Sequence, residues 1–163
     1  LVLLIAIMVM SSMAYDSVWK KGDALLSEIQ SNEKDIYVIT FANPTPVKDD
    51  YSRANTNNKV QDDLQSEVLN TYHGKELKIK YANVDTTDRE NAKLLYKAEI
   101  KDEDLSKGPV VLVSLKGFGK TIWGPTVVQS VGDYVKKVQE KAKADAAEAA
   151  KAAPPPASGS TAP

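Results

Sequence analysis

Asp35-Ile36-Tyr37-Val38-Ile39-Thr40-Phe41-Ala42 is an almost unbroken run of β-branched and aromatic residues, and Asn43-Pro44 follows it directly. A run of this length and composition predicts a strand that is buried on both faces, as at the centre of an α/β sheet. The next segment, residues 43–58, is polar and contains two prolines, so it predicts a loop, with a helical end as the alternative. The chain is therefore expected to fold around this strand.

The segments on either side of this strand alternate between helical and extended patterns. Apolar residues at helical spacing predict helices over 15–30, 60–72 and 126–141, and another that begins near Thr87. Strands are predicted over 77–85, 110–115 and 121–123. The first of these alternates lysines with apolar residues, which is typical of an edge strand with one wet face. The order predicts a mixed sheet covered by helices.

Several short motifs occur in one order that is known from a protein family. They are Phe41-Ala42-Asn43-Pro44 after the first strand, Val84-Asp85 at the end of the second, Gly108-Pro109-Val110 before the third, and the hairpin 116–124. Over about residues 15–141 the chain resembles the thioredoxin-like family, and within it the domains of protein disulfide isomerases. The resemblance implies an α/β fold with a mixed sheet of about four strands flanked by helices.

The resemblance also implies a site at the end of the first strand. The family's two active cysteines would fall at Pro46 and Asp49, and its cis-proline at Pro109. The chain contains no cysteine, and only a thiolate can attack a disulfide, so thiol redox chemistry is excluded. What the resemblance leaves is a surface for a protein partner, expected at Pro44, Pro46, Asp49, Gly108 and Pro109.

The composition of the chain argues against several further classes of function. A net charge of −1 gives no bulk electrostatic case for binding nucleic acid. His73 is the only histidine, and the acidic clusters lack the spacing of a calcium loop, so neither a metal site nor another cofactor is expected. The serines have no visible histidine and aspartate partners for a hydrolytic triad. We therefore expect no enzymatic activity.

The two ends of the chain differ from the middle. Residues 1–10 are wholly apolar and the first charge is Asp16. Residues 1–14 would span about 21 Å as a helix, short of the roughly 30 Å hydrocarbon core. They are either the hydrophobic region of a signal peptide, with cleavage before Tyr15, or part of a membrane anchor. Residues 142–163 predict an Ala/Lys-rich helix extension followed by a flexible, proline-rich tail.

Two functions fit these observations. The first is a non-catalytic, redox-inactive thioredoxin-like binding module, an accessory subunit of a membrane-associated assembly held to the membrane through its N-terminal segment. The second is a soluble, chaperone-like relative of protein disulfide isomerase that binds peptides in the secretory pathway. A mitochondrial or thylakoid membrane is as compatible with the sequence as the secretory route.

Overall fold

The computed structural model describes residues 15–45, 51–72 and 77–152. The N-terminal segment 1–14 and two of the predicted surface residues, Pro46 and Asp49, lie outside these ranges. The elements are β1 (Asp16–Ser17), α1 (Gly22–Ser31), β2 (Ile36–Ala42), α2 (Ser52–Asp63), the π-helical turn Leu64–Leu69, α3 (Asn70–Tyr72), β3 (Ile79–Asp85), the 3₁₀ turn Arg89–Asn91, α4 (Ala92–Lys97), the 3₁₀ turn Asp104–Lys107, β4 (Val110–Leu115), β5 (Phe118–Ile122) and α5 (Val127–Ala152).

The predicted central strand lies at the centre of the sheet. The strand order is β1-β3-β2-β4-β5, and all seven residues of β2 are buried. β2 pairs with β3 in parallel and with β4 antiparallel, and β4 pairs antiparallel with β5. This topology confirms the predicted fold class, a thioredoxin-like mixed sheet flanked by helices. The strand beyond the predicted four is the two-residue β1.

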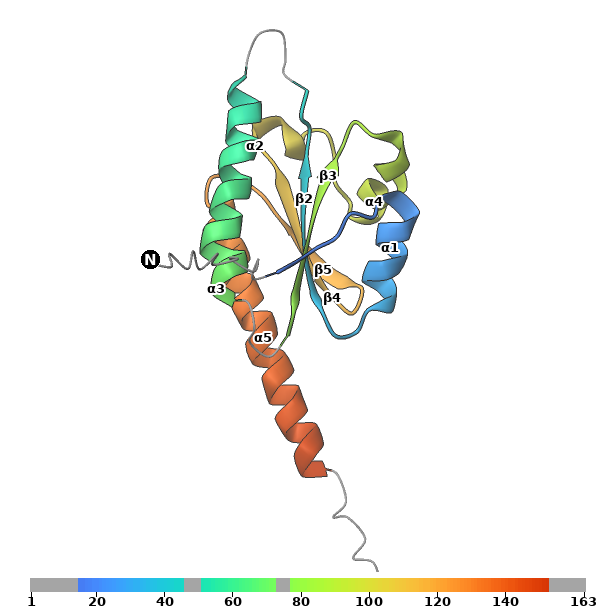
Figure 1. Ribbon diagram of the computed structural model, residues 1–163, viewed down its shortest axis with the longest axis vertical. Coiled ribbons are helices and arrows are strands. Elements are labelled where there is room, and N and C mark those ends of the chain that lie inside the picture. The colour runs from blue at the N-terminus through green and yellow to red at the C-terminus, as the bar shows by residue number, and fades with distance from the viewer. Residues whose placement is uncertain (1–14, 46–50, 73–76, 153–163) are drawn as a thin grey trace, which may run out of the picture.

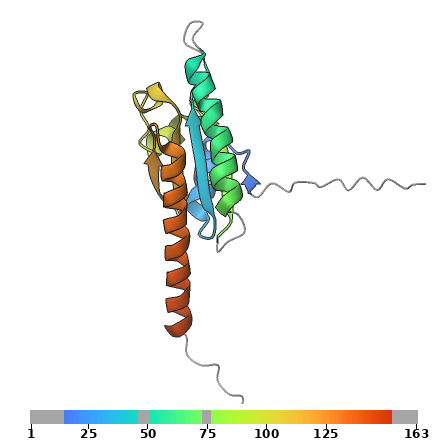
Figure 2. The same cartoon turned by 90° about the vertical axis from the view of Figure 1, so that its left-hand side faces the viewer.

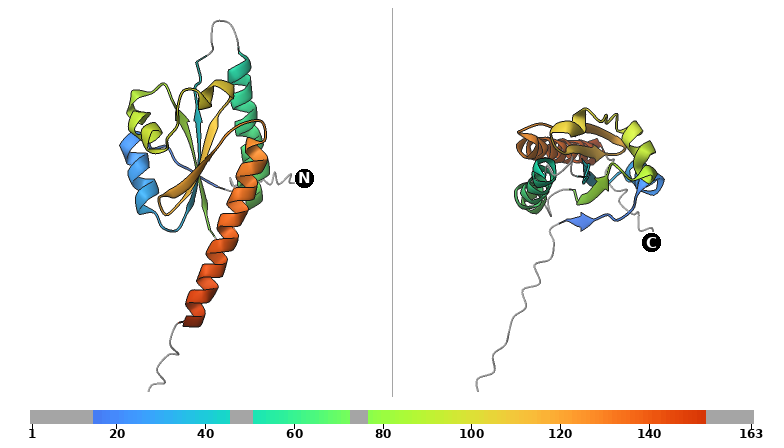
Figure 3. Two further views of the ribbon diagram at one scale, coloured as in Figure 1. Left: turned by 180° about the vertical axis from the view of Figure 1, so that it is seen from behind. Right: turned by 90° about the horizontal axis from the view of Figure 1, so that it is seen from above.

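Helices cover both faces of the sheet (Figures 1 and 3). On one face the apolar residues of α2, the π-helical turn and α5 pack on β2, β3 and β4, with Val131 and Val135 fully buried. On the other face α1 and α4 pack on Tyr37, Ile39 and Phe41. The two faces of β2 therefore each support a separate apolar cluster, as its two-sided burial requires.

The N-terminal part of the chain differs from its prediction. One helix was expected over residues 15–30, but the chain forms β1, turns, and begins α1 at Gly22. β1 pairs with β3 through Asp16 and Lys80, which lie far apart in the sequence. Gly22 has φ +49°, and its backbone N–H donates to Oδ1 of the buried Asn91 at 2.9 Å. A long-range contact therefore sets the start of the helix.

Two further expectations are corrected. β3 was predicted at an edge, but it lies between β1 and β2, with Ile79, Tyr81, Ala82 and Val84 buried. Its lysine pattern is misleading because an ion-pair cluster neutralises Lys80. The predicted loop 43–58 also gives way to its helical alternative at Ser52, where α2 begins.

The last helix is longer than the sheet it covers. α5 runs for 26 residues, and its C-terminal part extends beyond the rest of the domain (Figure 2). The predicted division at residue 141 falls inside this helix. Residues 143–151 are exposed. Across the described ranges, no helix is both long enough and apolar enough to cross a bilayer.

A cluster of charged and polar side chains ties α1 to β2 and β3. Glu28 accepts contacts from Lys20 at 2.8 Å, from Lys80 at 3.0 Å and from the Tyr37 hydroxyl at 2.9 Å. The hydrogen bond from Lys20 is the main reason that the Glu28 pKa falls to about 2. Burial opposes this shift, and the contacts from Lys80 and Tyr37 reinforce it. The cluster therefore favours the charged form of Glu28.

We expect this cluster to make stability depend on acid pH. The folded pKa of Glu28 lies below its ordinary value of 4.5, so its stabilisation is complete above pH 4.5 and is lost as pH falls towards 2. Allowing for solvent screening at the exposed Lys20, Glu28→Gln should lower the free energy of unfolding by about 1–3 kcal/mol at pH 7. Urea unfolding at pH 7 and pH 3 should show this difference shrinking. Glu33→Gln, at an exposed position that lines the same surface hollow as Glu28, is the control.

Candidate functional site

The candidate site lies where the chain leaves β2. Asn43 forms a local turn, because its Oδ1 accepts a hydrogen bond from the Thr45 N–H at 2.9 Å. The backbone carbonyl of Asn43 accepts a second bond from Nδ2 of Asn57 on α2, at 3.0 Å. Arg53 donates to the Thr45 carbonyl. These contacts hold the turn against α2 and leave Pro44 exposed.

The predicted proline loop also meets α2. A Cβ built on Gly108 would lie 3.4 Å from Cγ2 of Thr56, the residue before Asn57. α2 therefore brings together the two predicted parts of the surface, the turn at Pro44 and the loop at Gly108. Gly108 and Pro109 are themselves buried, so in this structure they support the surface from beneath.

The expected cis peptide bond before Pro109 is wrong, because the Gly108–Pro109 bond is trans. Gly108 has φ +149° and ψ −171°, a backbone conformation that is essentially open only to glycine. The glycine can therefore change the direction of the chain before β4 without a cis bond. Pro109 immediately precedes β4, where its missing N–H is tolerated.

A hollow of about 380 Å³ opens beside the turn, between the ends of β2 and β3 and the face of α2 from Ala54 to Gln61. Its walls carry four side-chain amides, which belong to Asn57, Asn58, Gln61 and Asn83. Pro44 and Asp85, the last residue of β3, also line it. Oδ1 of Asp85 accepts bonds from the N–H and hydroxyl of Thr87, at 2.8 and 2.6 Å.

Asn57 and Asn58 were missed at the sequence level because residues 43–58 were interpreted mainly as a loop. Gln61 and Asn83 lie in the predicted helix 60–72 and strand 77–85, where no local pattern marked them as site residues. Asn57 and Gln61 are four residues apart, which places them on one face of a helix once α2 is recognised. Amides both donate and accept hydrogen bonds, so the hollow suits a neutral polar group such as a peptide. Within the described residues, no group of three or more His, Cys, Asp or Glu residues could hold a metal ion.

No protein-family model matches the sequence, and no curated protein matches it. Among solved structures, the chain is similar to a thioredoxin from Trypanosoma brucei brucei. The sequence identity is 16%, the TM-score is 0.49, and the match covers 79% of this chain and 97% of the thioredoxin.

Proposed function

We propose that the chain is a non-catalytic thioredoxin-like binding module that acts as an accessory subunit of a membrane-associated assembly. This proposal rests on what the chain carries just after the end of β2. The position where the family resemblance places the redox thiols follows Asn43-Pro44-Thr45, and the chain has no cysteine. The same edge of the sheet carries the amide-lined hollow.

The chemistry at this edge supports binding rather than catalysis. Thiol–disulfide exchange needs a thiolate, and the amides of Asn57, Gln61 and Asn83 are not nucleophiles. Asp85, the carboxylate at the hollow, accepts two hydrogen bonds from Thr87. A peptide group presents one donor and one acceptor, which amide side chains can match in pairs. The partner is therefore proposed to be a protein.

The membrane part of the proposal rests on the N-terminal region. Residues 1–10 are apolar, and Trp19 follows shortly after them with 89% of its surface exposed. Tryptophan is enriched at membrane–water interfaces, where its ring lies at the level of the headgroups. Lys20 and Lys21 follow it directly. This arrangement suits a domain that is held close to a bilayer.

Purification of the full chain in mild detergent tests the proposal. A protein partner should co-purify with the native chain, and Asn83→Arg, which places a long charged side chain in the hollow, should reduce its recovery at least tenfold. Asn70→Arg makes the same change at an exposed position at the start of α3 and should retain the partner. A chain that runs as a free monomer would refute the subunit role.

Two measurements on the same material separate the alternatives. The mass of the native N-terminus should include residues 1–14; a chain that starts at Tyr15 would favour the soluble, peptide-binding relative. An assay of disulfide reduction with dithiothreitol as the electron donor should show no acceleration by the purified protein. Turnover in that assay would overturn the non-catalytic assignment.

A further inference from the structure

The last strand of the sheet has an open edge. β5 has one neighbour, β4, and within the described ranges no strand pairs with its other side. Its first three residues are exposed and the fourth is half-buried. Two aromatic side chains stand at its ends, Phe118 with 84% and Trp123 with 54% of its surface exposed. An open edge offers unpaired backbone groups to a second polypeptide.

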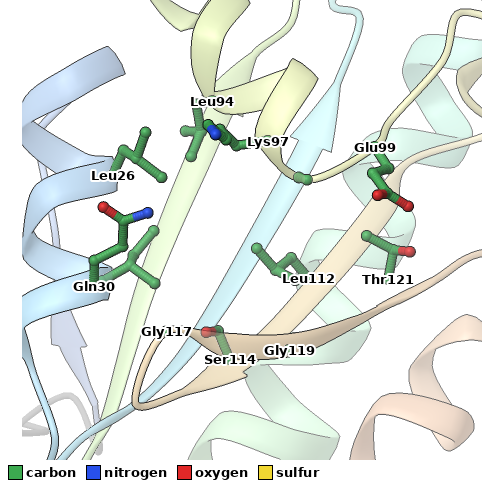
Figure 4. Close-up of a pocket in the computed structure, with 12 residues that line it drawn as sticks. Leu26, Gln30, Leu94, Lys97, Glu99, Leu112, Ser114, Gly117, Gly119 and Thr121 are labelled. Atoms are coloured by element: carbon green, nitrogen blue, oxygen red, sulfur yellow. The ribbon is translucent and has the colours of Figure 1, made fainter.

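The face of β5 towards α1 and α4 is hollowed, and we call this hollow the leucine groove. It measures about 350 Å³ and includes Leu26, Leu94 and Leu112 in its lining. β5 contributes only Gly119 and Thr121 to this face, so no large side chain fills the space. In Figure 4 the carboxylate of Glu99 lies at the rim, near Thr121. The groove suits one or two aliphatic side chains.

The opposite face of β5 carries a second hollow, the tyrosine groove, of about 400 Å³. α5 contributes Ser130, Asp133, Tyr134 and Lys137, which recur at helical spacing and so share one face. Lys120 of β5 contributes its ammonium group, which lies 6.0 Å from the centre of the Tyr134 ring. This distance is at the limit of a cation–π contact.

The position of Lys120 affects the open edge directly. A lysine on an edge strand commonly discourages pairing with another strand. Here the contact with Tyr134 draws the ammonium group towards α5. The backbone of β5 therefore stays accessible between the two grooves.

We propose that β5 accepts an extended segment of a partner polypeptide as a sixth strand, with aliphatic side chains in the leucine groove and acidic side chains in the tyrosine groove. Because side chains alternate along a strand, a single added strand would reach both grooves at once. The inference rests on the proposed binding function and assigns to it a surface separate from the hollow at β2.

The charges around β5 indicate which kind of polypeptide would bind there. Lys116, Lys120 and Lys137 lie on or beside the hairpin and the tyrosine groove, against the one carboxylate of Asp133. A second copy of this chain fits poorly, because pairing two β5 strands in full antiparallel register would bring Lys120 opposite itself. Residues 1–14 fit poorly too, because they contain no acidic residue. An acidic, alternating segment of another protein fits both grooves.

A peptide titration tests this surface. The full chain with Trp19→Phe keeps Trp123 as its single tryptophan and therefore as a local reporter. Acetyl-Val-Glu-Val-Glu-Val-Glu-amide should change its fluorescence saturably and slow hydrogen–deuterium exchange over residues 118–122. The same peptide with lysine in place of glutamate should bind at least tenfold more weakly. Equal binding of the two peptides, or no binding of either, would overturn the proposal.

Two neighbouring lysines of α5 provide the matched control. Lys137 lines the tyrosine groove, whereas the adjacent Lys136 is exposed and does not line it. Lys137→Glu should weaken the acidic peptide at least tenfold, and Lys136→Glu should leave its affinity within twofold. Equal losses in both variants would mean a general charge effect and would contradict the proposal. If the native partner co-purifies equally with Lys137→Glu and with the wild type, the proposed binding function is kept, but the proposal that the partner binds at β5 is contradicted.

Discussion

Phe41→Ala is expected to lower the free energy of unfolding by about 3–5 kcal/mol, the range typical of truncating a fully buried aromatic side chain. Phe41 lies on the central strand, is fully buried and belongs to the apolar cluster beneath α1 and α4. Truncation to alanine removes its transfer free energy and leaves a cavity that close-packed neighbours fill only in part. Urea unfolding monitored by circular dichroism measures the change.

The chain supplies its own control for this experiment. Its other phenylalanine, Phe118, is 84% exposed at the start of β5. Phe118→Ala should change the free energy of unfolding by less than about 0.5 kcal/mol, as is usual for surface positions. If the two substitutions cost the same, β2 is not the centre of the core.

Gly22→Ala is expected to cost about 2–4 kcal/mol. The backbone of Gly22 has φ +49°, which costs a residue with a Cβ roughly 1–2 kcal/mol. A Cβ there would also lie 2.3 Å from the backbone oxygen of Glu90, so the two segments must move apart. That movement would strain the hydrogen bond from Gly22 to the buried Asn91, a bond worth about 1 kcal/mol. Thermal or urea unfolding measures the loss.

Gly124→Ala separates the two causes. Gly124 also has a positive φ, +100°, but a Cβ built there meets nothing within 4 Å. Its substitution should therefore show a conformational cost without a clash, about 1–3 kcal/mol, because φ +100° lies outside the left-handed region that Gly22 occupies. A cost of only about 1–2 kcal/mol for Gly22→Ala, the left-handed conformation alone, would show that contact with Glu90 does not matter.

Prediction from the sequence succeeded where local pattern and burial agree. The apolar run at β2 predicted a central strand because both of its faces must be covered. The valines of α5 predicted a packed helix, and Val131 and Val135 are fully buried. The residues 43–58 were harder, since the first turns of α2 are polar and present no apolar stripe. Asn57 ties them to Asn43 across the turn, a contact that no local pattern reveals.

The sequence alone established that β2 is a strand buried on both faces, because the tendency of a side chain to be buried is a property of the residue. It also established that thiol chemistry is excluded, because the chain contains no cysteine. The place of β3 inside the sheet, the start of α1 at Gly22 and the trans bond before Pro109 depended on the folded chain. Each of the first two rests on a partner distant in sequence: Glu28 and Asp35 neutralise Lys80, and Asn91 holds Gly22. Contacts of this kind exist only once packing brings the segments together.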